Sequence, residues 1–73
     1  MKTGPEGFAA CVKEVRTQLG LSQEDLAHKL GVSFASINRW ENGKTRPSRL
    51  ARSQFALFCQ KMENEGRLRD VQV

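Results

Sequence analysis

The feature that most constrains this chain is a connection of only three residues, 31–33, between two short segments with the pattern of helices. The segments cover about residues 23–30 and 34–42, and each follows a serine, a residue suited to capping a helix N-terminus. A connection this short leaves the second helix no room to run alongside the first, so the two must cross at a steep angle. The sequence therefore predicts a sharp helical corner.

The residue types at this corner suit such a crossing. Ala27 is placed where the second helix crosses the first, and a larger side chain there would hold the two helices apart. Gly31 supplies the left-handed backbone conformation of the turn. Ile37 fills the angle between the helices from the other side. The remaining apolar residues of the corner are Leu26, Leu30, Val32 and Trp40. Together they predict a helix-turn-helix over about residues 22–43.

Two longer helices are predicted on either side of the corner, over about residues 5–19 and 48–64. Each carries apolar residues at the i, i+4, i+7 spacing of one helical face. In the first these are Phe8, Val12, Val15 and Leu19, and in the second Ala51, Phe55, Phe58 and Met62, with Leu50 and Leu57 expected to support them. No alternating run of β-branched residues competes with the helical pattern. We therefore expect an all-α fold.

The length of 73 residues, 38% of them apolar, predicts a single domain over residues 1–73 with one thin core. We expect flexible ends at 1–4 and 67–73, although Leu68, Val71 and Val73 have side chains that can pack. No apolar run approaches the roughly 20 residues needed to span a bilayer, and the first residues lack the apolar centre of a secretory signal. A cytoplasmic protein without membrane contact is expected.

The charged residues are unevenly distributed along the chain. Twelve Lys and Arg against eight Asp and Glu give a net charge of +4. Residues 42–61 contain no acidic residue and hold five of the basic ones: Lys44, Arg46, Arg49, Arg52 and Lys61. Such a block indicates either a polyanionic partner or an ordinary solvated cationic helix.

Three stretches, 21–27, 30–33 and 37–44, carry a more specific signal. The run Trp-Glu-Asn-Gly at 40–43, followed by a basic loop and Pro47, is its clearest part. In these stretches, and over about residues 8–62 as a whole, the chain resembles the lambda-repressor-like, or XRE-type, helix-turn-helix family. The resemblance implies a compact fold of four to five helices and sequence-specific binding of double-stranded DNA, as in a small transcriptional regulator. Here the sequence after Pro47 predicts one long helix, so either the usual fourth and fifth helices are fused or the last one is absent.

In this family the second helix of the corner, here about residues 34–42, enters the major groove. The expected base contacts are Ser33, Phe34, Ala35, Ser36 and Arg39. Arg39 can bond to guanine through two hydrogen bonds, whereas Phe34 and Ala35 can touch thymine methyl groups. The alternatives are that Phe34 is a half-buried core residue and that Arg39 contacts phosphate or is a free surface charge.

The expected phosphate contacts are Gln23, Asn42, Lys44, Thr45 and Arg46. Gln23 opens a helix whose positive end suits an anion, and in the family the residue at this position clamps a phosphate. The other four residues follow the second helix of the corner in a loop that would lie along the DNA backbone. Their backbone N–H groups can bind phosphate as well as their side chains.

Glu41 is unusual because an acidic residue beside a DNA-facing loop repels phosphate unless another charge neutralises it. In the family, the residue at the position of Arg16 pairs with this glutamate. We therefore expect a partly buried Arg16–Glu41 ion pair that ties the first helix to the third.

Other functions are less well supported. The chain lacks an evident set of catalytic groups, and two cysteines with one histidine form no metal-ligand cluster. We therefore expect no enzyme activity, cofactor, metal or small-molecule substrate. An adaptor module that binds an acidic protein is the alternative, and the apolar pair at 34–35 is mildly consistent with it. One copy would read only a few base pairs, so we expect a homodimer on DNA.

Overall fold

The structure is a computed structural model that describes residues 5–43 and 47–69. Within these ranges the chain forms four helices and no strand: α1 (Pro5–Leu19), α2 (Gln23–Leu30), α3 (Phe34–Asn42) and α4 (Arg49–Asn64). The all-α prediction is confirmed, and the helix bounds agree with those expected to within one residue. Among the described residues, no helix is both long and apolar enough to cross a membrane.

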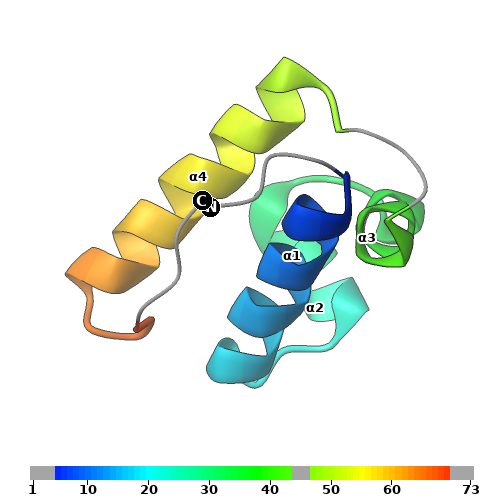
Figure 1. Cartoon of the computed structure of the whole chain (residues 1–73). Coiled ribbons are helices and arrows are strands. Elements are labelled where there is room, and N and C mark those ends of the chain that lie inside the picture. Colours follow the sequence, from blue (N-terminus) through cyan, green and yellow to red (C-terminus); the bar gives the residue numbers. More distant parts are fainter. Residues whose placement is uncertain (1–4, 44–46, 70–73) are drawn as a thin grey trace.

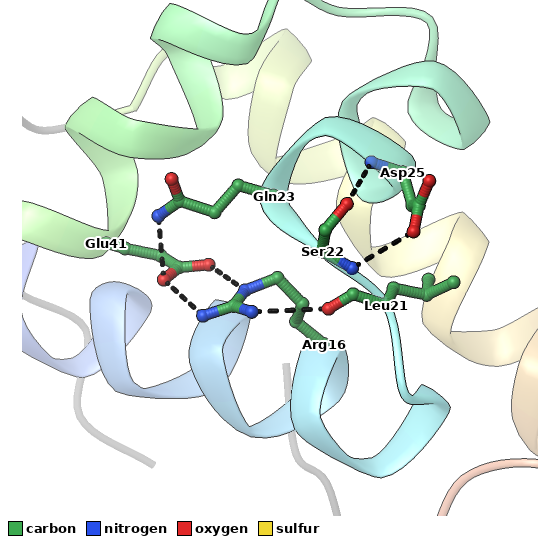
Figure 2. Close-up of polar contacts among 6 residues, drawn as sticks. All are labelled: Arg16, Leu21, Ser22, Gln23, Asp25 and Glu41. Atoms are coloured by element: carbon green, nitrogen blue, oxygen red, sulfur yellow. Dashed lines mark hydrogen bonds and ion pairs between the residues drawn. The ribbon is translucent and has the colours of Figure 1, made fainter.

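Serine side chains start three of the helices. At α2, Ser22 Oγ accepts a hydrogen bond from the Asp25 amide at 3.0 Å, and Asp25 Oδ2 accepts one from the Ser22 amide at 3.2 Å (Figure 2). Ser33 and Ser48 cap α3 and α4 through one such bond each, both 3.1 Å long. Because the caps satisfy amides that have no partner within the helix, they fix where each helix begins.

The corner between α2 and α3 is built on Gly31. Its φ of +73° is left-handed, and a Cβ added there would meet nothing within 4 Å. The glycine is thus required by the backbone conformation and not by lack of space. The Val32 amide then donates to the Ala27 carbonyl at 3.0 Å, which closes the turn. In Figure 1, α3 is seen nearly along its axis whereas α4 lies across the picture, so the two helices run in different directions.

The hydrophobic core is centred on Phe8 of α1. Its ring meets Trp40 of α3 at 5.5 Å between centroids and Phe55 of α4 at 5.4 Å, both edge to face. Leu26 of α2 and Ile37 of α3 are fully buried in the same cluster. Because every helix contributes to this one cluster, the inner side of α3 is packed into the core.

Two expectations need correction. Leu50 and Leu57 of α4 do not support the core but are 69% and 68% exposed. Leu57 lies two residues from the buried Phe55, which places it on the opposite side of a helix with 3.6 residues per turn. Leu68, in the end expected to be flexible, is buried. Gln18 of α1 holds Arg69, the residue after Leu68. Its Nε2 donates to the Arg69 carbonyl at 2.9 Å, and its Oε1 accepts from the Arg69 amide at 2.8 Å.

Candidate nucleic-acid interface

The outer face of α3 is open to solvent. Ile37 and Trp40 point inward and are buried, whereas Ala35 and Arg39 are exposed. Residues four apart on a helix share a face, so Ala35 and Arg39 lie one above the other on the outside. Phe34 is 50% exposed and is absent from the core cluster. The reading of Phe34 as a core residue is therefore not supported.

The two serines expected at base edges are engaged with their own helix. Ser33 Oγ accepts the Ser36 amide at 3.1 Å, and the two hydroxyl oxygens are hydrogen-bonded at 3.0 Å. Ser33 is exposed and Ser36 is half-buried. The first turn of α3 thus satisfies its own hydroxyls, while the neighbouring apolar side chains face water.

An open groove of about 390 Å³ runs between α3 and the start of α4. Ser36 and Arg39 line it from α3, and Leu50 and Gln54 line it from α4. The guanidinium of Arg39 therefore has space around it. The loop with Lys44, Thr45 and Arg46 lies outside the described residues, as do residues 1–4 and 70–73.

Behind this face, Arg16 and Glu41 form the ion pair that the family resemblance implies (Figure 2). Arg16 Nε donates to Glu41 Oε2 at 2.7 Å, and Nη2 donates to Oε1 at 3.0 Å. The pair joins the last turn of α1 to the last turn of α3. The Glu41 side chain is 3% exposed and that of Arg16 is 24% exposed. A two-bond pair with one partner buried is stronger than an ordinary surface ion pair.

The same arginine also fixes the connection between α1 and α2. Its Nη1 donates to the Leu21 carbonyl at 3.2 Å, and its own carbonyl accepts the Leu21 amide at 3.0 Å. Arg16, a residue of α1, therefore bonds both to the approach to α2 and to α3. Nothing in the residue types predicts the bond to Leu21, since any carbonyl can accept it.

Gln23 takes part in this network as well. Its Nε2 donates to Glu41 Oε1 at 3.1 Å, so the first residue of α2 is tied to the end of α3 (Figure 2). The amide nitrogen of glutamine carries two hydrogens, and this bond uses one of them. Of the remaining expected phosphate contacts, Asn42 is exposed at the end of α3.

The electrostatics of the network follow from these contacts. Burial alone would raise the pKa of Glu41, but the hydrogen bonds from Arg16 and Gln23 outweigh it and hold that pKa below its usual value. The bond to Glu41 raises the pKa of Arg16 against the opposing effect of its own burial. Both groups therefore stay charged at neutral pH and neutralise each other.

Comparison with known proteins gives a consistent picture. Residues 12–50 match the helix-turn-helix family model, from the middle of α1 to the first residues of α4. The chain is 41% identical over 59 residues, 77% of its length, to "Type II methyltransferase M1.ScrFI" of Lactococcus lactis subsp. cremoris. It is 49% identical over 37 residues, 51% of its length, to the "Uncharacterized transcriptional regulator in ATPase CF(0) region" of Rhodospirillum rubrum. These alignments cover only 15% and 34% of the two relatives. No solved structure gives a significant match.

Proposed function

This chain belongs to the XRE-type helix-turn-helix family of DNA-binding domains, and from that premise we propose that it is a sequence-specific regulator of transcription that inserts α3 into the major groove of double-stranded DNA. The observation that carries the proposal is the outer face of α3, where Arg39 and its apolar neighbours are exposed while the inner face is fixed in the core. A helix presented in this way fits the groove. The proposal places the protein in the cytoplasm.

Base reading in this proposal centres on Arg39. Its guanidinium can donate two parallel hydrogen bonds to O6 and N7 of guanine, the commonest specific contact in the major groove. Phe34 and Ala35, one turn earlier, face the neighbouring bases with carbon atoms. Ser33 and Ser36 are weaker readers in this scheme, because each hydroxyl must share or give up its bond to the other in order to reach a base.

Phosphate binding would follow from the N-terminus of α2 and from the segment after α3. Gln23 stands at the positive end of α2, where exposed N–H groups suit an anion, and its bond to Glu41 holds the amide in one orientation. Asn42, Thr45 and the basic residues Lys44 and Arg46 would extend the contact along the backbone. These contacts position the protein, and base contacts supply specificity.

We further propose that two copies bind together, with α4 as the dimer surface. Leu50 and Leu57 lie seven residues apart on one exposed face of α4. The helix has two basic residues at its start, Arg49 and Arg52, whereas Glu63 and the C-cap Glu65 outnumber the one basic residue, Lys61, at its end. An antiparallel pairing about Leu57 would bring the basic start of each copy beside the acidic end of the other. It would also bury the leucines.

The area of such a contact is small for a stable dimer. A stable interface buries about 800 Å² per partner, and one face of a helix about 24 Å long supplies less than that. We therefore expect a dimer that is weak in solution and is completed on DNA by two half-sites. These would lie about one helical turn apart.

The test is to select bound sequences from a random duplex library and to measure the affinity of the selected duplex by fluorescence anisotropy at several salt concentrations. With about five phosphate contacts, the logarithm of the affinity should fall against the logarithm of the salt concentration with a slope near −4 to −5. A shuffled duplex of the same composition is the control. Absence of binding to any duplex at low salt would refute the proposal and favour the adaptor alternative.

A further inference from the structure

The first turn of α3 presents carbon where a reader of base edges usually presents polar groups. Phe34 is the first residue of the helix and the one large apolar side chain of α3 that is strongly exposed, at 50%. Ala35, next to it, is exposed as well. The core does not need this ring, since Phe8, Trp40 and Phe55 fill it with edge-to-face contacts.

The polar atoms of the same turn are already in use. Ser33 Oγ is the cap of α3, and its remaining contact is with the hydroxyl of Ser36. Each hydroxyl therefore has a partner within the helix before any ligand arrives. A ligand that binds this turn can contact the phenyl ring and the methyl group without breaking a hydrogen bond. Contact with either serine hydroxyl would instead break the serine pair and leave polar groups that need new partners.

Only one apolar group lies on the base edges of the major groove. Adenine, guanine and cytosine present nitrogen and oxygen donors and acceptors there, whereas thymine adds the methyl group on C5. A 5-methylcytosine carries a methyl group on the same ring atom, at the same edge of its base pair. A carbon surface has no hydrogen-bonding group with which to tell these two pyrimidines apart.

We propose that Phe34 and Ala35 form a reader of pyrimidine C5-methyl groups, so that 5-methylcytosine can replace thymine in the recognition sequence and cytosine methylation strengthens DNA binding. This inference rests on the proposed function. It goes beyond it by naming a covalent mark on DNA to which the affinity responds.

The position of the methyl group relative to the guanine follows from the helix. Ala35 and Arg39 are four residues apart, which is about 6 Å along the helix axis. Successive base pairs are about 3.4 Å apart along the axis of the duplex. The methyl group read by the first turn should therefore lie about two base pairs from the guanine read by Arg39. A methylated cytosine at that distance is the expected high-affinity variant.

The magnitude follows from the burial of one methyl group. Covering a CH₂-sized group stabilises by about 0.8 kcal/mol, which corresponds to about a fourfold change in the dissociation constant at each half-site. Replacing the contacted thymine by uracil should weaken binding by about this factor. At a contacted C·G pair, 5-methylcytosine should bind about fourfold more tightly than cytosine.

The experiment uses the duplex selected from the random library. Each thymine is replaced in turn by uracil, which removes only the methyl group. The T·A pair that responds is then changed to C·G, with either cytosine or 5-methylcytosine in place of the thymine. Affinities are measured by anisotropy for the wild-type chain and for the double variant Phe34→Asn, Ala35→Ser. Both residues are exposed and lie outside the core, so the variant should keep its circular dichroism and melting temperature. His28→Asn, which alters an exposed residue of α2, is the matched control.

The expected result is a loss at one uracil position and a gain from 5-methylcytosine, both abolished in the double variant and retained in His28→Asn. Tight, salt-dependent binding that ignores every methyl group would overturn this inference and leave the proposed function standing. A methyl effect that persists in the double variant would assign the reader to another surface. Failure of the wild-type chain to bind any duplex would instead remove the proposed function.

Discussion

The most direct test of how this fold is held together is the replacement of Arg16 by Met, which keeps an unbranched apolar stem and removes the guanidinium. The change deletes both hydrogen bonds to Glu41 and the one to the Leu21 carbonyl. Glu41, with a side chain only 3% exposed, is left with the single bond from Gln23.

The magnitude follows from that burial. A carboxylate stranded after removal of its partner typically costs about 3–5 kcal/mol of unfolding free energy. Arg16 itself is 24% exposed, so water can enter the space it vacates. We therefore expect a loss of about 3 kcal/mol, at the lower end of that range. Since a domain of this size is only marginally stable, the variant should melt at a much lower temperature.

The assay is urea unfolding followed by circular dichroism on four chains: the wild type, Arg16→Met, Glu41→Leu and the double variant. Because an apolar pair can replace a buried ion pair at little cost, the double variant should be more stable than Arg16→Met alone. The coupling energy between the two positions should exceed about 1 kcal/mol. Thr17→Met, which alters an exposed residue on the same helix, serves as the control.

The dependence on pH supplies a second arm. The pKa of Glu41 is lowered in the folded chain, so its contribution to stability is present above the pKa of the unfolded state, about 4.3, and is lost as the pH falls through the folded value. In Arg16→Met the stranded carboxyl is relieved by protonation. The difference in stability between the wild type and the variant should therefore shrink from pH 7 to pH 3. A difference below about 0.5 kcal/mol at pH 7, the value of an exposed pair, or one that does not change with pH, would refute this account.

Three further outcomes are expected. Arg39→Ala should relax the preference at one base pair by about 1–3 kcal/mol, and selected sequences that keep every preference would show that Arg39 is not a reader. Leu57→Glu should bind a single half-site as the wild type does but lose cooperativity on two half-sites, unlike the control Thr17→Glu on the exposed side of α1. Burial raises the pKa of the Cys59 thiol to about 12 and also raises that of Cys11. Since the thiolate is the reactive form, alkylation at pH 8 should be slow in the native protein and fast in urea; rapid alkylation without urea would contradict the burial.

The corner could be predicted because its determinants are local. A serine cap, a left-handed glycine and an alanine at the crossing each act within a few residues, so spacing along the chain fixes the bounds of α2 and α3. The Arg16–Glu41 pair, by contrast, joins residues 25 positions apart. Its prediction depended on the family resemblance, since many other pairings of charges are compatible with the composition.

The remaining errors and gaps share a physical cause. The exposure of Leu50 and Leu57 was missed because hydrophobicity says that a residue can be buried and not which of several faces of α4 meets the core. The clamp of Gln18 on the Arg69 backbone and the bond from Gln23 to Glu41 were missed because an amide side chain can pair with almost any polar group within reach. In such cases the tertiary arrangement selects the partner, and the sequence does not.

The network around Glu41 links the two kinds of DNA contact in the proposed function. An acidic residue near DNA would repel phosphate, but here two donors hold its charge: Arg16 neutralises it and Gln23 shares one of its oxygens. Since Gln23 opens α2 and Glu41 closes α3, the orientation of the phosphate-binding amide depends on where the reading helix lies. A shift of α3 would move the Glu41 oxygen and with it Gln23. The base contacts and the phosphate contact would then form or break together. This coupling would let a small domain with few contacts discriminate between DNA sequences more sharply than independent contacts would allow.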